Sequence, residues 1–368
     1  MTTKKRKSDG ISASPCHPFI KPRSNGTKQF NDKSIPVRLQ QELDMSGFHI
    51  FECISDKGFF SWKPARGTPY EALESISDAK DFTKFLDLNG KPDVLVHPSR
   101  IQTPKAFQSP PPDEYENKYP FGKIDATCLY VASRHRNIDF AADIDFYFGG
   151  STLEMLASCD ASEPFVATLL PDTRVILVVK NKEYIQNLSA QGFQFERLMT
   201  GKPLRGHIDD GTNVISSVEH LHVMNVGTHR VFFRAEVDAI DEQDGYPVEI
   251  KTLSPRHWRT KVMFQMISSG STRLCHGIKG PGYLQNICMK PLHEVSRTAL
   301  VGSRGVQHLE DTILKGMTSL RSQMKNAKPG EVFRIYFRSG TLSLNRERAN
   351  ILPPPDIVRE LVVSKSIE

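Results

Sequence analysis

The chain has 368 residues, a mass of 41.5 kDa and a formal net charge of +6, which is enough chain for one large domain or two average ones. Hydrophobic residues make up 38% and charged residues 24%, and this balance excludes a collagen, a coiled coil and a fully disordered chain. The best apolar run, residues 175–179, is far shorter than the ~18 residues of a membrane helix. We therefore expect no membrane span, and the mild positive charge is compatible with a phosphate-bearing partner.

The first part of the chain has the composition of a leader. Residues 1–35 are rich in Ser, Lys and Pro without apolar periodicity, which predicts a disordered basic leader before a domain over residues 36–368. The run from Lys4 to Lys7 fits a nuclear address or a solvated basic arm, and no secretory signal precedes it. Six cysteines lack zinc-type spacing, so we expect reduced thiols in an intracellular protein of the nucleus, the cytoplasm or both.

The predicted elements are dominated by strands. In chain order, strands are expected at residues 93–96, 126–132, 174–179, 231–240, 247–253, 332–337 and 342–344, and helices near residues 152–157, 258–267 and 308–325. Proline-rich stretches at residues 108–113 and 353–355 predict surface loops. Because strands outnumber helices without regular alternation, we expect an α/β (α+β) fold of mixed β-sheets flanked by helices in a single compact domain.

The strands at residues 231–240 and 247–253 are predicted to form a hairpin. Alternation places Glu236 and Asp238 on one face of the first strand, and Glu249 and Lys251 on one face of the second. A tight turn centred between residues 243 and 244 puts Asp238 opposite Glu249, and a turn centred one residue later puts Asp238 opposite Lys251. In both registers the four charged side chains share a face.

Three carboxylates on one face repel one another. A like-charge pair ~4 Å apart costs roughly 4 kcal/mol at an effective dielectric near 20. Oxygen ligands of this kind suit Mg²⁺ or Mn²⁺, and a nearby lysine can hold a phosphate or polarise water. The alternative is the solvated outer face of an antiparallel hairpin, where alternating charges are common.

The spacing of these residues resembles two known nuclease patterns. Asp238 with Glu249-Ile250-Lys251 resembles the PD-(D/E)xK nuclease pattern, and Glu236-Val-Asp238 with Glu249-Ile-Lys251 resembles the paired motifs of the decapping exoribonuclease (DXO-like) family. That family also has a glycine followed four positions later by a glutamate at a helix start, usually with an aromatic or bulky apolar residue after the glycine. Gly150-Ser-Thr-Leu-Glu154 has this spacing.

Two more marks of the family have candidates in the chain. A glutamine on the helix after the lysine, with a basic residue four positions earlier, is matched by Gln265 and Lys261. An arginine at the end of an early strand, normally in a Trp-Arg-Gly setting, has Arg100 as its candidate. Considered singly, Arg100, Gln265 and Glu154 are as typical of surface residues as of a functional site. Their order along the chain favours a site.

The resemblance implies a PD-(D/E)xK-like core that hydrolyses RNA 5′ ends with two Mg²⁺ or Mn²⁺ ions. It implies removal of aberrant or NAD-type caps or of pyrophosphate, and 5′-to-3′ exoribonuclease activity in some members. Glu154, Glu236, Asp238, Glu249 and the carbonyl of Ile250 would bind metal, Lys251 and Gln265 would position the scissile phosphate and water, and Arg100 would contact substrate. The alternatives are a non-catalytic RNA-binding relative that stabilises a nuclear 5′-to-3′ exoribonuclease, and a nuclease that acts on DNA.

Overall fold

The computed structural model describes residues 34–62, 83–84, 86–106, 116–117, 123–161, 164–181, 186–187, 190–201, 218–253, 260–300, 305–349 and 351–362. They belong to one compact unit, residues 31–368. The predicted leader lies outside the described residues except for its last two, which begin the first helix, and the predicted loop at residues 108–113 also lies outside them. Within the described part of the chain, no helix has the length and apolarity to cross a membrane.

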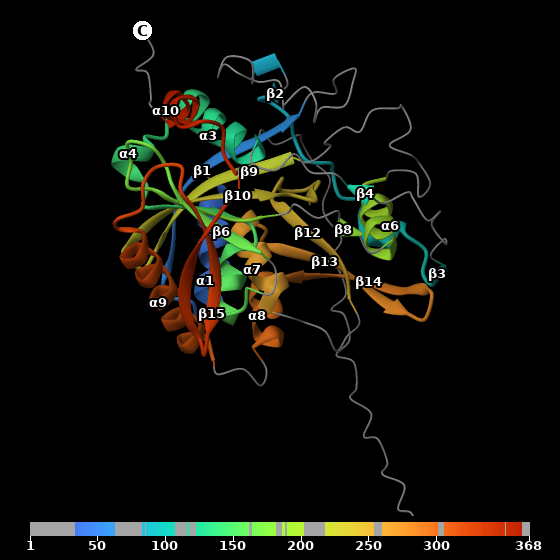
Figure 1. Cartoon of the computed structure of the whole chain (residues 1–368). Coiled ribbons are helices and arrows are strands. Elements are labelled where there is room, and N and C mark those ends of the chain that lie inside the picture. Colours follow the sequence, from blue (N-terminus) through green and yellow to red (C-terminus); the bar gives the residue numbers. More distant parts are fainter. Residues whose placement is uncertain are drawn as a thin grey trace, which may run out of the picture. The chain divides into compact units, whose positions relative to one another are not determined.

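Two mixed sheets form the framework (Figure 1). The nine-stranded sheet has the order β16 (Thr341–Glu347), β15 (Val332–Arg338), β6 (Phe165–Leu169), β7 (Ile176–Lys180), β5 (Phe146–Gly149), β10 (His229–Glu236), β9 (Val218–Val226), β1 (Phe51–Trp62), β2 (Leu86–Asp87). The five-stranded sheet has the order β11 (Ala239–Ile240), β12 (Pro247–Leu253), β13 (Arg273–Gly280), β14 (Tyr283–Pro291), β3 (Lys105–Ala106). Short strands β4 (Glu116–Asn117) and β8 (Gln186–Asn187) pair separately. Three neighbouring pairs, β5–β7, β5–β10 and β12–β13, are parallel.

Helices cover both faces of the nine-stranded sheet. One face packs against α1 (Ser34–Met45), α5 (Thr152–Ser158), α7 (Thr260–Ser269), α8 (Leu292–Ala299) and α9 (Val306–Met324). The other face packs against α3 (Lys123–His135), α4 (Phe140–Asp143) and α10 (Pro355–Val362). On the five-stranded sheet, α6 (Ala190–Met199) buries Phe195 and Met199, and the short helix η2 (Pro98–Arg100) lies outside these layers.

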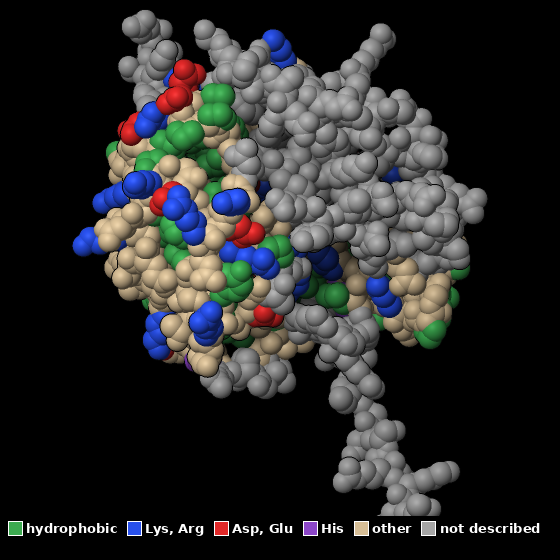
Figure 2. All heavy atoms as spheres, viewed as in Figure 1, with side chains coloured by type: hydrophobic (Ala, Val, Ile, Leu, Met, Phe, Trp, Pro, Cys, Tyr) green, Lys and Arg blue, Asp and Glu red, His purple; other side chains and the backbone are tan. Residues whose placement is uncertain are grey.

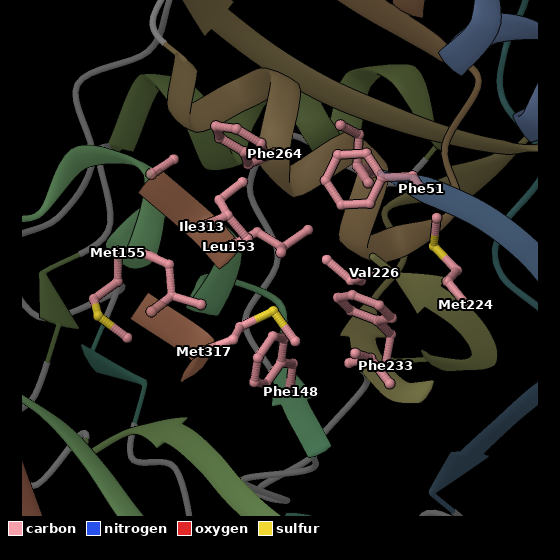
Figure 3. Close-up of a cluster of buried hydrophobic side chains, with 14 of the residues drawn as sticks. Phe51, Phe148, Leu153, Met155, Met224, Val226, Phe233, Phe264, Ile313 and Met317 are labelled. Carbon is pink, nitrogen blue, oxygen red and sulfur yellow. The ribbon is translucent and has the colours of Figure 1, made fainter. Parts of the chain in front are cut away.

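The central strands are buried on both faces because helices lie on each side. On β10, Val231 and Phe233 belong to the core that Figure 3 shows, together with Phe264 of α7 and Met317 of α9. The intervening Phe232 is also fully buried and belongs to the core on the opposite face. The expectation that one face of this strand is core and the other charged therefore holds only at its end, from Arg234 onward.

Most predicted elements are confirmed with shifted ends. The strand at residues 247–253 is β12, those at 174–179, 332–337 and 342–344 are β7, β15 and β16, and the helices near 152–157, 258–267 and 308–325 are α5, α7 and α9. The α+β architecture of mixed sheets flanked by helices is confirmed. The five described cysteines are free thiols, as expected.

Two predicted strands are wrong. Residues 126–132 lie inside helix α3, where they are almost all buried against the nine-stranded sheet and α10. A continuous apolar run of this length does not distinguish a buried strand from a buried helix. Residues 93–96 form only an isolated bridge from Val94 to Ile240, and no regular strand.

The predicted hairpin is divided between the two sheets. Residues 231–240 form β10, which ends at Glu236, and β11, which begins at Ala239. Ala239 pairs with Val248, the register expected from a turn centred between residues 243 and 244. Glu236 instead pairs with Glu219 of β9 in the nine-stranded sheet. The chain thus crosses from one sheet to the other at residues 237–238, and this crossing brings the two sheets together at the candidate site.

On the face shown in Figure 2, the described basic side chains alternate with acidic ones and do not form one continuous patch. In Figure 2, the described part of the visible face carries Lys and Arg side chains over the region of α9 and the β15–β16 hairpin, interspersed with Asp and Glu. The net positive charge therefore does not by itself locate a nucleic-acid site.

Candidate active site

A polar cleft of about 180 Å³ opens where the two sheets meet under α7. Its walls are the ends of β5, β7 and β10, the start of α5, the strand β12 and one side of α7. The lining residues are Gly149, Gly150, Ser151, Val179, Lys180, Arg234, Ala235, Glu236, Asp238, Glu249, Lys251, Gln265 and Ser269. Five residues that the sequence predicted as catalytic are therefore together: Glu236, Asp238, Glu249, Lys251 and Gln265.

Lys251 lies between two of the predicted carboxylates. Its Nζ is 2.6 Å from Glu249 Oε1 and 3.1 Å from Asp238 Oδ2. Asp238 Oδ2 also accepts a hydrogen bond of 2.7 Å from the backbone N–H of Ile250, which fixes the crossing segment onto β12. Ile250 itself is fully buried, facing the core under α6. Although burial alone would lower the pKa of Lys251, the carboxylates of Asp238, Glu249 and Glu196 raise it well above its ordinary value.

Burial disfavours the charged form of the Glu249 carboxylate. Its side chain is 6% exposed, and burial is the main cause that raises its pKa to about 7, with a further contribution from Asp238 and an opposing one from Lys251. A carboxylate held this far from water is stabilised by an added cation.

The helix α7 presents Gln265 to the cleft because its other sides are buried. Met263, Phe264, Met266 and Ile267 all lie in the core. Gln265 and Lys261, four residues apart on the remaining side, are half-buried. The predicted Gln265 is therefore at the cleft wall, while Lys261 Nζ lies 3.9 Å from Glu154 Oε2.

A carboxylate that the sequence analysis missed belongs to this group. Glu196 of α6 is half-buried, and burial together with the charges of Asp238, Glu236 and Glu249 raises its pKa to about 8. Its neighbour Phe195 is fully buried against β12 and anchors the helix there. Glu196, like Glu154, is not among the described residues that line the cleft, and its charge interactions with Asp238 and Lys251 are what relate it to the predicted acidic group.

The sequence contained a signal for Glu196. Gly192-Phe-Gln-Phe-Glu196 has a glycine, an aromatic residue directly after it and a glutamate four positions on, on a helix. Gly150-Ser-Thr-Leu-Glu154 has the same spacing but lacks the aromatic residue. Glu154 lies in the first turn of α5, pairs with Lys261 and is not among the described residues that line the cleft.

Arg100 lies away from the cleft. It ends η2, its side chain is 67% exposed, and its guanidinium is 3.7 Å from the exposed carboxylate of Glu242. The end of β5 reads Phe148-Gly149-Gly150, which has the aromatic residue and the final glycine of the Trp-Arg-Gly mark. Gly149 stands where that mark has arginine, and on the adjacent strand β10 its register partner is Arg234.

A buried histidine fixes the end of α7 at the back of the cleft. His220 of β9 has its Nδ1 2.8 Å from the carbonyl of Ser269 and its Nε2 2.9 Å from Asp56 Oδ1. The two contacts hold the imidazole ring between β1 and the end of α7. Gly270 follows at φ +72°, and a Cβ there would lie 2.9 Å from His220 Cε1, so glycine is required at this close approach.

The donors at the cleft suit a divalent cation. Glu236, Asp238 and Glu249 line the cleft, with the Lys251 ammonium in contact with the last two, and oxygen-only ligands are those that Mg²⁺ and Mn²⁺ prefer. Among the described residues, no three Asp, Glu, His or Cys side chains already converge on one point, and Lys251 Nζ lies between Asp238 and Glu249. The type of the donor atoms, and the buried Glu249 carboxylate with its raised pKa, nevertheless fit a metal ion.

Comparison with solved structures identifies the fold. Schizosaccharomyces pombe Rai1 aligns with a TM-score of 0.58 at 13% identity, covering 82% of this chain and 96% of that one. The chain has the Rai1/Dxo1 fold. Candida albicans Rai1 in complex with pU5-Mn²⁺ gives 0.56 at 11% identity, covering 83% and 94%, and Kluyveromyces lactis Dxo1 in complex with manganese gives 0.53 at 11%, covering 82% and 91%. No protein-family model and no curated protein sequence matches the chain.

The Rai1/Dxo1 fold agrees with the resemblance found in the motifs. The fold expected from Glu236-Val-Asp238 and Glu249-Ile-Lys251 is confirmed, although the sequences share only 11–14% identity.

Proposed function

We propose that this protein is a divalent-metal-dependent hydrolase that acts on the 5′ end of RNA. The observation that carries the proposal is the joint placement of Glu236, Asp238, Glu249, Lys251 and Gln265 around one cleft in a chain with the Rai1/Dxo1 fold. The preferred reactions are removal of an aberrant or NAD-type cap, or of pyrophosphate, with 5′-to-3′ exoribonuclease activity as an accompanying reaction.

The acidic residues of the cleft would hold the metal ions. Glu236, Asp238, Glu249 and the Ile250 carbonyl are the proposed ligands, and Glu196 takes the place of Glu154 as the further carboxylate because of its coupling to Asp238. Bound Mg²⁺ or Mn²⁺ ions, two in our proposal, would stabilise charge on the phosphate oxygens and lower the pKa of water. The manganese in the Candida albicans and Kluyveromyces lactis structures supports a divalent cation here.

The remaining cleft residues act on the phosphate and the water. The Lys251 ammonium, kept charged by its carboxylate neighbours, donates hydrogen bonds to an oxygen of the scissile phosphate. The Gln265 amide, held at the wall by the buried side of α7, orients the attacking water. Together these groups fix the phosphate and the nucleophile in line, and that positioning is the main contribution of side chains to phosphoryl transfer.

The ligands of the structural neighbours support the proposed substrate class. A Candida albicans Rai1 structure contains pU5 and a Schizosaccharomyces pombe Rai1 structure contains 3′-FADP, which supports a 5′-terminal nucleotide as the ligand of this cleft. The presence of Glu196, Glu236, Asp238 and Glu249 favours an enzyme over a non-catalytic scaffold that stabilises an exoribonuclease partner.

A cleavage assay tests the proposal. RNAs labelled at the 5′ end that carry a triphosphate, a guanosine cap, an NAD cap or a monophosphate are incubated with the protein, beside matched DNA, with Mg²⁺, Mn²⁺ or EDTA. The double variant Glu236→Gln/Asp238→Asn removes two proposed ligands. Glu242→Gln, at an exposed carboxylate outside the cleft, is the matched control.

We expect metal-dependent release of the 5′ group from RNA by the protein and by Glu242→Gln, and at least 100-fold slower release by the double variant. Equal turnover by the double variant would remove the assigned site. RNA binding without turnover under any metal condition would support the scaffold instead, and preferential cleavage of DNA would overturn the substrate class.

A further inference from the structure

Two cations face the acidic residues across the cleft. Lys180 is the last residue of β7, and Arg234 lies near the end of β10. The strand between them is β5, which ends at Gly149, and Gly149 and Gly150 form the wall between the two cations. Because these glycines have no side chains, the Lys180 and Arg234 side chains are the charged groups that this wall presents.

Arg234 is held in a defined orientation. Its Nε lies 3.3 Å from Asp125 Oδ1 and 3.7 Å from Glu219 Oε2, and Asp125 is itself fixed by a 2.8 Å hydrogen bond from Tyr147 Oη. Burial alone would lower the pKa of the guanidinium, but Glu219 and Asp125 raise it well above its ordinary value. The group is therefore a permanent cation, and its Nε makes ion pairs with two carboxylates without a hydrogen bond to either.

The outer part of the guanidinium is available. Both contacts with carboxylates use Nε, and among the described residues the two terminal amino groups make no hydrogen bond. The side chain is 18% exposed and lines the cleft. A planar pair of N–H donors with its carbon skeleton fixed is suited to bind two oxygens of one phosphate.

The position of Arg234 relative to the acidic residues sets which phosphate it can reach. Arg234 and Glu236 are two residues apart on β10, so their side chains leave the same face ~6.6 Å apart along the strand. This separation is of the order of one nucleotide step. A phosphate at Glu236 and Asp238 therefore has its neighbouring phosphate near Arg234.

We propose that Arg234 and Lys180 form a second phosphate subsite, which binds the phosphate group next to the one that is hydrolysed. The inference rests on the proposed function, because that function defines which phosphate is hydrolysed. Binding of the second phosphate can be measured without hydrolysis. The neighbouring phosphate belongs either to the RNA body, as a phosphodiester on the 3′ side, or to a 5′ polyphosphate.

Binding measurements without turnover test the subsite. The ligands are uridine 5′-monophosphate with one phosphate, the dinucleotide pUpU with a second phosphate on the 3′ side, and uridine 5′-triphosphate with further phosphates on the 5′ side. Dissociation constants are measured in Ca²⁺ over a series of salt concentrations for the protein and for Arg234→Lys and Lys180→Gln. Arg230→Lys, at an exposed arginine of the same strand that pairs with Asp143, is the matched control.

We expect both cleft variants to weaken pUpU or the triphosphate about tenfold and to leave the monophosphate within about twofold. For the affected ligand, the logarithm of the association constant falls as the logarithm of the salt concentration rises. This slope should become shallower by about 0.7 for each lost phosphate contact. Arg230→Lys should match the parent protein. The ligand that loses affinity identifies the side on which the second phosphate lies.

Equal weakening of all three ligands, or no change in any of them, would overturn the subsite. Arg234→Lys keeps the charge that neutralises Asp125 and Glu219, and a thermal unfolding curve checks that this variant is folded. Lys180→Gln, at a half-buried strand end, is a second variant that tests the subsite independently. Selective loss of the multi-phosphate ligand in a protein that hydrolyses no RNA would retain the subsite and reject the proposed function.

Discussion

At the scale of single residues, the candidate site combines charged side chains from two neighbouring segments with a glutamate from a distant helix. Glu236, Asp238, Glu249 and Lys251 come from two short segments whose spacing is readable, and all four line the cleft. Glu196 comes from a helix whose approach to β12 depends on packing of Phe195. The sequence offered two glycine-to-glutamate spacings, and only the folded chain distinguishes Glu196 from Glu154.

Glu196 and Glu154 can be compared in one experiment. Glu196→Gln removes a carboxylate coupled to Asp238 and Lys251, so we expect kcat for the RNA substrate to fall at least 100-fold. Glu154→Gln removes a carboxylate that pairs with Lys261 outside the cleft lining, and kcat should stay within about threefold. Steady-state kinetics of the two variants in Mn²⁺ check this, and the reverse ranking would restore Glu154 as the metal-site residue.

At the scale of elements, local patterns predicted the type of most elements and the pairing of Ala239 with Val248, but not the partners of β10. The strand at residues 247–253 was bounded correctly because alternating and turn residues are local signals. The break between β10 and β11 was missed because the chain changes sheets there. β10 pairs with the preceding strand β9 and with β5, which is far away in sequence. Helix α3 was mistaken for a strand because it is buried along nearly its whole length.

The strand β9 carries a histidine that must stay neutral. His222 stacks on Phe233 and on His220, and neither ring nitrogen has a hydrogen-bond partner among the described residues. Burial and the nearby charge of His220 lower its pKa to about 3, with Asp56 opposing. Since the unfolded chain binds this proton near pH 6.5, the folded state loses stability as the pH falls from about 6.5 toward 3.

Replacing His222 tests this directly. The proton taken up on unfolding contributes a slope of about 1.4 kcal/mol per pH unit to the free energy of unfolding in that window. His222→Phe removes the titrating group and keeps the stacking, so urea unfolding between pH 4.5 and 6.5 should show a slope smaller by about this amount. His308→Gln, at an exposed position of α9, should leave the slope unchanged, and an unaltered slope in His222→Phe would contradict the account.

At the scale of the whole molecule, the α+β class followed from the sequence, whereas the strand order did not. Helices on one face of the nine-stranded sheet are joined to β1 and to one another by buried carboxylates. Glu310 of α9 accepts backbone hydrogen bonds from His49 and Ile50 at the start of β1, and Glu42 of α1 binds the His293 ring and backbone on α8. Such contacts span the chain and have no local sequence signature.

The Glu310 contact should matter for stability and not for catalysis. Glu310→Ala leaves two part-buried backbone N–H groups without their acceptor, and we expect a loss of about 2 kcal/mol in the free energy of unfolding. The protein should still unfold in one cooperative transition, with kcat and KM unchanged. Glu294→Gln, whose carboxylate makes a more exposed pair with Lys290, should cost less than about 0.5 kcal/mol. Calorimetry of both variants checks the difference.

The central claim is that the carboxylates between the two sheets bind a divalent cation. Anomalous scattering from crystals of the full chain grown with Mn²⁺ measures this most directly. We predict a manganese peak among Glu196, Glu236, Asp238 and Glu249, absent in Glu236→Gln/Asp238→Asn crystals. A cleft with no peak, and with Lys251 still paired to Asp238 and Glu249 at saturating Mn²⁺, would contradict the account.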